Sequence, residues 1–536
     1  MAGSSRVTGL CLCIRLSGHE NRPVTQRSPY PDIEIPELSV TEYVIGPAAE
    51  RGDAVAVIDG TTGERTTYAE LSRQVATAAR IIGDLGVGQG DVVALMSRNQ
   101  PAYISAFHGV IAAGGSVTPL NPVLTAEEAA IQVGDSGAKV VLVDDATVGK
   151  GEEVARAVGA RLVMLDASWP GPSDDQGLPA RPAGFDPARS VAALPYSSGT
   201  TGRAKGVMLT HRNLVANLAQ FTPMWPYGPD DVVCAVLPMF HIYGMNVIMN
   251  LALARGSTIV TLPRFEVEGY LGTIERHRVT RLHLAPPMVL QLVSSPEVER
   301  FDLSSVRWAV SGAAPLDAEL AARFERRFGV PVSQGYGMTE ASPGTHLIPE
   351  RDQDAAPTGS VGWLMPNTEG RLVSPDTGED SDEAGEIWVR GPQVMAGYLN
   401  NPTATAETLT ADGWLKTGDV ARVEDGAYFI VDRVKELIKY KGYQVAPAEL
   451  EALLLTHPDV GDVAVVPMAH EAGGEAPKAF VVATGELDAD ALMSWVAERV
   501  APYKRIRAVA FIDEIPKSPS GKILRRVLRD QARVAS

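Results

Sequence analysis

The chain has 536 residues, more than one hydrophobic core usually supports, so we expect two or more domains. Its formal net charge of -17 argues against general binding to nucleic acid or to anionic membrane surfaces, although a local basic pocket could still bind a polyanionic cofactor. Hydrophobic residues at 45% and charged residues at 21% are ordinary proportions for a soluble globular protein.

The three cysteines, Cys11, Cys13 and Cys234, are too few and too badly spaced for a disulfide framework or a structural zinc site. A reducing, cytoplasmic setting is therefore expected. Arg15 interrupts the early apolar run well short of a signal sequence, and no segment is long enough to span a bilayer. Residues 1–36 are rich in Ser, Arg and Pro without any period, and we interpret them as a disordered tail or an overextended start.

From residue 37 onward, helical and strand patterns alternate. An amphipathic helix is predicted from Tyr68 to Leu85, with strands at Val92–Met96 and Val140–Val143. Such alternation predicts an α/β fold in which helices cover parallel sheets. The strand series continues at Val232–Val236, Thr258–Leu262 and Val306–Ser311. After about Gly359, short strands rich in Gly, Asp and Thr predict an antiparallel, β-rich subdomain.

The last domain boundary is predicted between Asp432 and Arg433. Residues 37–432 then form a large N-terminal domain, and residues 433–536 form a small α+β domain. The pattern of the small domain predicts, in order, a hairpin to Tyr443, a helix that begins at Pro447, strands at Val463–Val466 and Ala479–Ala483, a helix at Asp488–Val500 and a strand at Ala508–Ile512.

The densest chemical signal is the stretch from residue 197 to residue 206. Its small residues let backbone N–H groups approach phosphate, its hydroxyls add neutral donors, and Lys205 adds a positive charge. A strand pattern precedes the stretch and a helix pattern begins near Arg212, so we expect a phosphate loop between a strand and a helix. It is not a Walker A loop, because Lys205 is followed by Gly206 rather than Ser or Thr. A flexible linker is the alternative for this stretch alone.

Four further segments carry chemistry. Residues 334–340 offer the Tyr336 ring for a base, the Thr339 hydroxyl for phosphate and the Glu340 carboxylate for magnesium. Asp419 lies at a turn, where its carboxylate can accept both hydroxyls of a ribose. Residues 433–444 form a charged strand pair at the domain junction, and residues 516–522 form a loop that presents Lys522. Singly, each segment has an ordinary structural explanation.

In this order the five motifs resemble the acyl-adenylate-forming superfamily, and within it the branch of 4-coumarate:CoA ligases and luciferases. The resemblance extends from about Leu38 to the C-terminus. It implies ATP, Mg²⁺ and coenzyme A as cofactors, with Glu340 as the metal ligand. It also implies phosphate and nucleotide contacts from Ser197, Ser198, Gly199, Thr200, Thr201, Gly202, Lys205, Gly312, Ala313, Ala314, Gly335, Tyr336, Gly337, Thr339, Asp419 and Arg433.

The small domain has further roles by the same resemblance. Lys522 matches the lysine that bridges the substrate carboxylate and the α-phosphate, and Lys439 and Gln444 match a pair that assists around the adenylate. Lys435 matches a hinge about which the domain rotates, so that Lys441 and Gly442 replace Lys522 at the cleft during the thioester step.

The segment 238–244 resembles the element that flanks the acyl pocket of coumarate ligases, where His241 is a gate or lining residue; a hydrogen-bonded core histidine is the alternative. Apolar or small residues replace polar or larger ones at Val247, Val310 and Gly344. We therefore expect an enlarged apolar pocket, for a fatty acid or a bulky aromatic or polycyclic acid rather than a hydroxycinnamate. The expected lining is His241, Tyr243, Val247, Val310, Gly337, Pro343 and Gly344.

The sequence thus predicts an ATP-dependent, AMP-forming carboxylic acid:CoA ligase. Three alternatives stay open: an adenylate-former that loads a carrier protein or runs only one half-reaction, an oxidative luciferase-like enzyme, and a non-catalytic acyl or nucleotide binder. The expected partners are a small carboxylic acid, ATP and CoA, with no nucleic acid and no membrane span. A homodimer and a carrier protein are not excluded.

Overall fold

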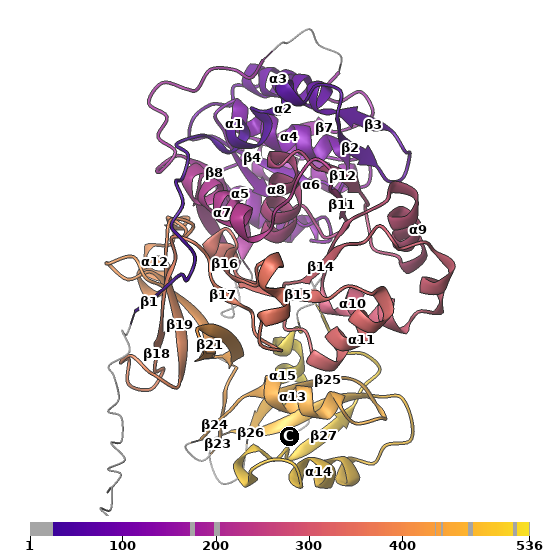
Figure 1. The fold of residues 1–536 in the computed structure, drawn as a ribbon. Helices are drawn as coiled ribbons and strands as arrows, with labels where there is room; N and C mark the ends of the chain where they lie inside the picture. The colour runs from indigo at the N-terminus through magenta and orange to yellow at the C-terminus, as the bar shows by residue number, and fades with distance from the viewer. Residues whose placement is uncertain are drawn as a thin grey trace, which may run out of the picture.

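The structure, a computed structural model, describes residues 25–171, 177–197, 204–434, 436–440, 443–469, 475–517 and 523–534. A large N-terminal part contains two mostly parallel sheets and an antiparallel sheet, and a small C-terminal part lies below it in Figure 1. The predicted α/β class is confirmed.

The first sheet of the N-terminal part has the order β20-β10-β8-β5-β4-β6-β7, with β9 beside β10. Strands β4 and β6 have the bounds predicted for them, and all their residues are buried because helices cover both faces. The strands are β4 (Val92–Met96), β5 (Ser116–Pro119), β6 (Val140–Val143), β7 (Arg161–Met164), β8 (Val191–Ala193), β9 (Tyr196–Ser197), β10 (Lys205–Thr210) and β20 (Gly397–Tyr398).

The second sheet has the order β17-β16-β15-β14-β13-β11-β12-β2-β3 and is parallel from β15 to β2. Its strands are β2 (Val55–Asp59), β3 (Arg65–Thr67), β11 (Val232–Ala235), β12 (Thr258–Thr261), β13 (Arg281–Leu284), β14 (Trp308–Ser311), β15 (Val332–Gly337), β16 (Gly344–Leu347) and β17 (Trp363–Leu364). The β11, β12 and β14 bounds lie within the predicted strands.

Helices pack on these sheets. The first long one, α3, begins at the predicted Tyr68, because Thr67 and Glu70 form a reciprocal capping box at its N-terminus. The helices are α1 (Val40–Ile45), α2 (Ala48–Arg51), α3 (Tyr68–Asp84), α4 (Pro101–Ala112), α5 (Ala126–Ser136), α6 (Val148–Val158), α7 (His211–Met224), the π-helix η1 (Tyr243–Asn250), α8 (Leu251–Ala254), α9 (Val267–His277), α10 (Pro286–Ser294), η2 (Pro296–Arg300), α11 (Ala318–Phe328), η3 (Thr339–Ala341), η4 (Glu350–Ala355) and α12 (Pro402–Thr408). No helix of the described residues is long and apolar enough to cross a membrane.

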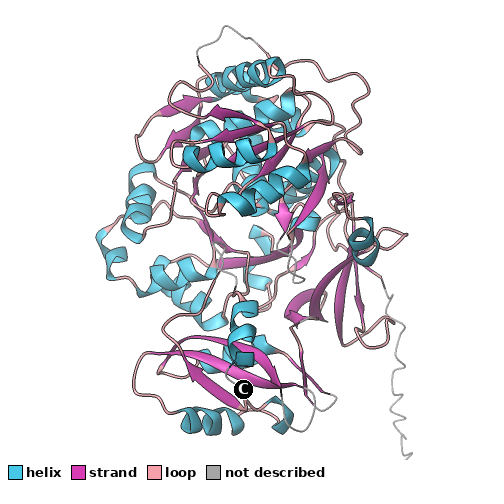
Figure 2. Ribbon diagram, turned by 180° about the vertical axis from the view of Figure 1, so that it is seen from behind, coloured by secondary structure: helices cyan, strands magenta, loops and turns pink. Residues whose placement is uncertain are grey.

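The third sheet is antiparallel, as predicted for the region after Gly359, and has the order β1-β18-β19-β21-β22. Figure 2 shows it standing apart from the two parallel sheets. Its strands are β1 (Gln26–Arg27), β18 (Glu369–Val373), β19 (Ala384–Arg390), β21 (Leu415–Glu424) and β22 (Ala427–Arg433).

The interpretation of residues 1–36 as a disordered tail is wrong for residues 25–36. There, β1 pairs with β18, with Gln26 opposite Gly370. Beyond the strand, the Ser28 hydroxyl donates to the Leu364 carbonyl at 2.8 Å, and the backbone and side chain of Asn367 exchange hydrogen bonds with the segment around Ile33. The sequence of this segment has no hydrophobic period because hydrogen bonds, rather than an apolar face, position it on the sheet.

The phosphate loop leads into a strand rather than into a helix, which corrects the prediction. β10 begins at Lys205 and runs antiparallel to β9 and β8, and α7 follows only at His211. The apolar run Val207–Leu209 forms the core of this strand. The strand was not predicted because its first residues, Lys205 and Gly206, belong to the loop motif. The N-terminus of α7 is capped by Thr210 and Asn213, six residues after the start of β10.

The C-terminal part has a hydrophobic core of its own, which includes Ile438, Leu450, Val465 and Val481. Strand β25 is antiparallel to β26, and β27 is parallel to β26, with helices packed on this sheet (Figure 2). The elements are β23 (Ile438–Tyr440), β24 (Tyr443–Val445), α13 (Pro447–Leu455), β25 (Val460–Ala469), β26 (Glu475–Ala483), α14 (Ala489–Ala497), η5 (Pro502–Lys504), β27 (Ala508–Phe511) and α15 (Arg525–Val534).

Candidate active site

Three predicted nucleotide residues from distant parts of the chain bond to one another. The Tyr336 hydroxyl donates to Asp419 Oδ2 at 2.6 Å, and Arg433 Nε lies 3.1 Å from Asp419 Oδ1. Tyr336 comes from β15 in the second sheet, whereas the other two come from the antiparallel sheet. The arrangement therefore joins the second sheet to the β-rich subdomain.

Local backbone geometry sets this arrangement. Asp419 in β21 and Arg433 in β22 are directly opposite in the strand pairing. The Thr417 hydroxyl accepts from the Asp419 backbone N–H and donates to the Ile387 carbonyl at 2.7 Å, which fixes an irregularity in the strand just before Asp419, rather than the predicted turn. The carboxylate is thus held by the strands and keeps only limited freedom to reorient.

Burial raises the pKa of Tyr336 well above its ordinary value, and the Asp419 carboxylate raises it further. The phenol is therefore a hydrogen-bond donor throughout the physiological pH range. Its ring centroid lies 5.7 Å from that of His346 in a tilted arrangement. A base bound beside Tyr336 would meet a neutral ring whose hydroxyl is already engaged.

Glu340 forms the centre of a second cluster. The Ser197 hydroxyl donates to Glu340 Oε1 at 2.9 Å, and the Tyr398 hydroxyl donates to the same oxygen at 2.8 Å. Lys205 Nζ lies 4.7 Å from the centroid of the Tyr398 ring, within cation–π range. The two described ends of the phosphate loop, Ser197 and Lys205, therefore converge on Glu340 and Tyr398.

The donor set of this cluster fits magnesium. Mg²⁺ in nucleotide enzymes is usually held by one or two carboxylates together with substrate phosphates. Glu340 is 6% exposed, and both of these hydroxyls donate to Oε1, so among the described residues Oε2 is the oxygen left for a cation. Glu340 would hold the metal, and the metal would neutralise phosphate charge.

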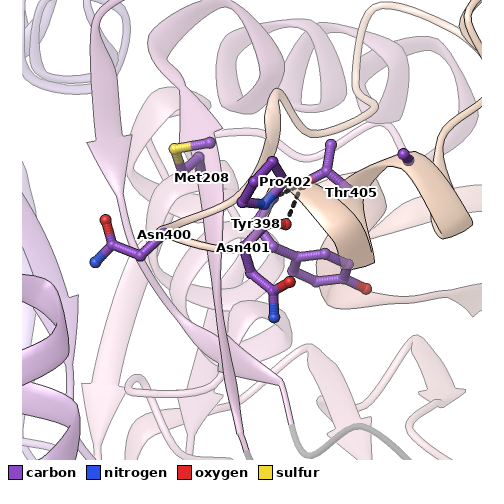
Figure 3. A pocket seen from close by; sticks show the side chains of 7 residues that line it. Met208, Tyr398, Asn400, Asn401, Pro402 and Thr405 are labelled. Carbon is purple, nitrogen blue, oxygen red and sulfur yellow. Dashed lines mark hydrogen bonds between the residues drawn. The ribbon is translucent and has the colours of Figure 1, made fainter.

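A shallow pocket of about 370 Å³ lies beside this cluster and is lined by Met208, Tyr398, Asn400, Asn401, Pro402, Thr405 and Ala406. In Figure 3 the Tyr398 ring points away from Met208 and Asn400, and the Tyr398 backbone N–H donates to the Thr405 hydroxyl at 2.9 Å. None of the seven lining residues belongs to the predicted site. The pocket lies on the side of β20 away from the Glu340 cluster.

The predicted acyl segment lies at the start of η1. His241 Nδ1 accepts from the Tyr243 backbone N–H at 3.3 Å. The Tyr243 ring packs on Gly312, where a Cβ atom would lie 3.0 Å from Tyr243 Cε1. The turn after β14 also holds Ala313 at a φ of +70°, a left-handed conformation that is uncommon for alanine. Tyr243 and the turn 312–314 therefore form one surface.

The expectation of extra room at Gly344 is wrong. A Cβ atom at Gly344 would lie 2.8 Å from the Phe221 ring and 2.9 Å from the Met365 sulfur, so these side chains already fill the space. Val247 and Val310 are each 1% exposed and belong to the main core, and Pro343 is also buried. These positions give a closely packed wall.

The remaining predicted residues divide into two groups. Gly335 and Gly337 lie in β15 opposite Leu347 and Gly344, and Thr339 begins η3. Lys439 and Gln444 are opposite each other in the β23–β24 hairpin. The second group lies outside the described residues: Ser198, Gly199, Thr200, Thr201, Gly202, Lys435, Lys441, Gly442 and Lys522.

Comparison with known proteins agrees with this geometry. Residues 47–399 match the AMP-binding enzyme family, and residues 449–522 match the AMP-binding enzyme C-terminal domain. The chain belongs to the AMP-binding enzyme family. The predicted membership of the acyl-adenylate-forming superfamily is thereby confirmed, as is the prediction of an AMP-forming acid–CoA ligase that uses ATP, Mg²⁺ and CoA.

Among the relatives of this AMP-binding enzyme, 4-coumarate--CoA ligase 3 of Oryza sativa subsp. japonica is 42% identical over 96% of this chain and 95% of its own length. 4-coumarate--CoA ligase 1 of Arabidopsis thaliana is 43% identical over 96% of each chain. The structure of ATP-bound MatB from Rhodopseudomonas palustris matches with a TM-score of 0.84 and 28% identity, covering 92% of this chain and 99% of that one.

Two residues that contact the candidate site, Tyr398 and His283, were not singled out from the sequence. Tyr398 precedes the polar turn at Asn400 and Asn401, and its aromatic ring directly after Gly397 is the signal that could have singled it out. His283 contacts Tyr243, with the two side chains 3.0 Å apart. Nothing in the local sequence marks His283, because its role depends on contacts with distant segments.

Proposed function

We propose that this AMP-binding enzyme holds ATP between the Glu340 cluster and the Tyr336–Asp419–Arg433 triad and adenylates a carboxylic acid before its transfer to CoA. The observation that carries the proposal is the triad itself, in which Tyr336, 83 positions before Asp419 in the sequence, and Arg433 both bond to the Asp419 carboxylate, at 2.6 Å and 3.1 Å. An ion pair between Asp419 and Arg433 that served only stability would not require the Tyr336 phenol as a third partner.

In this arrangement Asp419 accepts the ribose hydroxyls, and Arg433 balances the carboxylate charge. Ser197 and Lys205 hold the β- and γ-phosphates, and Glu340 would hold a magnesium ion that neutralises phosphate charge. A carboxylate oxygen of the acid attacks the α-phosphorus and pyrophosphate leaves with the electron pair of the broken P–O bond. CoA sulfur then attacks the acyl carbon, loses its proton to water, and AMP departs.

Lys522 is proposed to enter the cleft for the first step. Two anions, the acid and the α-phosphate, must come together there, and negative charge grows at the transition state, so an ammonium group at that point lowers the barrier. The small domain would then rotate about Lys435 and place Lys441 and Gly442 at the cleft for the second step, while Lys439 and Gln444 assist around the adenylate.

For the acid, we propose a planar aromatic substrate of the 4-coumarate type. The filled space at Gly344 removes the main reason for expecting a larger acid. The relatives named 4-coumarate--CoA ligase, at 42% and 43% identity over nearly whole chains, support the same choice. The buried Val247 and Val310 still favour an apolar body for the acid.

The test is pyrophosphate release from the purified full-length chain with ATP, Mg²⁺ and a panel of acids: aliphatic acids of several lengths, benzoates, cinnamates and polycyclic acids. We expect the highest kcat/KM with a cinnamate and an acyl-CoA product by mass spectrometry. A preference for long-chain or polycyclic acids would overturn the choice of acid. Pyrophosphate release without thioester formation from CoA would favour a carrier-protein acceptor or a single half-reaction.

The two-step model gives a sharper prediction for Lys522→Ala. Adenylate formation should fall by about a hundredfold or more, whereas thioester formation from synthetic acyl-AMP should stay largely intact. Lys517→Ala is a matched control in the same loop, because the Lys517 ammonium is paired with Asp462 at 2.6 Å. Equal losses in both steps for Lys522→Ala would contradict the rotation of the domain.

A further inference from the structure

His283 connects two tyrosines that come from separate segments. It lies in β13 and is fully buried. Its Nδ1 is 3.0 Å from the Tyr243 hydroxyl, and its Nε2 hydrogen-bonds the hydroxyl of Tyr227. Tyr227 is 1% exposed, whereas Tyr243 keeps accessible surface. Of these three residues, Tyr243 is therefore the one with surface open to a ligand.

The imidazole of His283 is neutral. Burial lowers its pKa to about 3, with the nearby Arg281 charge as the second cause. A neutral imidazole has one N–H donor and one bare nitrogen. One tyrosine therefore accepts a hydrogen bond from the ring, and the other donates one to it. The tautomer of His283 decides whether Tyr243 offers a third group its proton or a lone pair.

The position of this trio matches the proposed acid site. His283 is opposite Val310 in the pairing of β13 with β14. The Tyr243 ring lies on Gly312, which directly follows β14. Because Val247 and Val310 carry no polar atoms in their side chains, a hydroxyl fixed at this place has a large effect on which acids are bound.

We propose that His283 is a positioning residue for acid selectivity, which fixes the Tyr243 ring and hydroxyl at the acid site and so favours acids with a hydrogen-bonding group away from the carboxylate. The inference rests on the proposed function, because Tyr243 meets an acid only if the chain adenylates one. His283 itself touches no substrate and acts through Tyr243.

Two amide variants separate the hydrogen bonds of His283. The amide group of asparagine is as many bonds from Cα as Nδ1 of histidine, so His283→Asn can keep the bond to Tyr243 and lose the bond to Tyr227. Glutamine reaches the position of Nε2, so His283→Gln can keep Tyr227 and lose Tyr243. Tyr243→Phe removes the hydroxyl and preserves the ring on Gly312.

The measurement is kcat/KM for the best acid of the panel and for the same acid without its hydrogen-bonding substituent, with 4-coumarate and cinnamate as the first pair. We expect the intact protein to prefer the substituted acid. His283→Gln and Tyr243→Phe should each reduce this preference by about three- to tenfold, the effect of one hydrogen bond, with the KM for ATP changed by less than about twofold. His283→Asn should retain the preference, and the double variant His283→Gln/Tyr243→Phe should lose no more than either single variant.

Several results would overturn the inference while leaving the proposed function in place. The first is an active protein whose best acid lacks a hydrogen-bonding substituent. The second is a preference for the substituted acid that is unchanged in His283→Gln, or that changes equally in His283→Gln and His283→Asn. The third is a KM for ATP that rises as much as the KM for the acid in these variants. Thermal denaturation identifies any variant that fails to fold, and Tyr243→Phe then supplies the same comparison. Absence of pyrophosphate release with every acid would instead refute the proposed function.

Discussion

At the scale of single residues, Tyr398 shows how a side chain can support a site by orienting the residues that bind the ligand. Its hydroxyl donates to Glu340, its ring lies beneath Lys205, and its backbone N–H is held by Thr405. Burial, and next the nearby Glu340 carboxylate, raise its pKa, so the phenol stays protonated and remains a donor. We therefore expect Tyr398 to orient the Glu340 carboxylate, the proposed magnesium ligand.

Tyr398→Phe tests this orientation because it removes the hydroxyl and leaves the ring beneath Lys205. A hydrogen bond to a charged group contributes roughly 1.5 kcal/mol or more, so the KM for MgATP should rise about tenfold while the KM for the acid stays the same. Tyr196→Phe is the matched control, since Tyr196 donates to the Asp135 carboxylate at 2.6 Å, outside the cluster. An unchanged KM for MgATP in Tyr398→Phe would contradict the role.

The residue scale also shows where sequence reasoning reaches its limit. Tyr336, Asp419 and Arg433 were predicted individually, and the structure brings them together because β21 and β22 place two of them opposite each other. The expectation of extra room at Gly344 was wrong because the side chain of Phe221, 123 positions away in the sequence, fills that space. A glycine indicates that a side chain is missing, and only the packed structure shows what replaces it.

At the scale of elements, buried strands could be predicted closely. β4 and β6 match their predicted bounds because each is a continuous apolar run between polar turns. β10 was missed because Lys205 and Gly206 belong to a loop motif, although the apolar residues after them form a strand. β1 was missed because a strand of two residues has no measurable period.

Truncation of the N-terminal segment tests the role of β1. Removal of residues 1–36 deletes the pairing of β1 with β18 and the hydrogen bonds of Ser28 and Ile33, whereas removal of residues 1–24 keeps them. At about 1 kcal/mol for each hydrogen bond, the longer deletion should lower the free energy of unfolding by roughly 2–4 kcal/mol relative to the shorter one. Equal denaturant midpoints for the two proteins would show that the segment contributes no stability.

At the scale of the whole molecule, buried charges connect the two parts of the chain. Asp432, near the end of β22, accepts from the backbone N–H groups of Arg433 and Ala448, and Ala448 belongs to α13 of the small domain. Arg525 of α15 bonds both Glu436 and Glu451. The carboxylate of Asp432 in β22 therefore accepts a hydrogen bond from the first turn of α13.

Burial raises the pKa of Asp432 from its ordinary 3.8 to about 6. The folded protein then binds this proton more tightly than the unfolded chain, so the group contributes stability that is fully present below about pH 4 and is lost as the pH rises through about 6. The difference amounts to about 3 kcal/mol. Relative to Asp432→Asn, which cannot titrate, the intact protein should lose thermal stability between pH 4 and pH 7.

Thermal denaturation of both proteins across this range measures the effect. Asp425→Asn, at an exposed turn of the same strand pair, serves as the control. A difference in melting temperature between the intact protein and Asp432→Asn that is constant with pH would contradict the assignment. A difference that grows in favour of the intact protein as the pH rises would show that pairing with the neighbouring arginine outweighs burial.

The contact of β1 with β18 has a consequence for the behaviour of the protein in concentrated solution. An unpaired outer strand presents free N–H and C=O groups, to which another copy can add a strand and begin to aggregate. Because residues 26 and 27 occupy that position on β18, the chain covers part of its own exposed edge. A protein without this cover would offer the edge to its neighbours and become more prone to self-association.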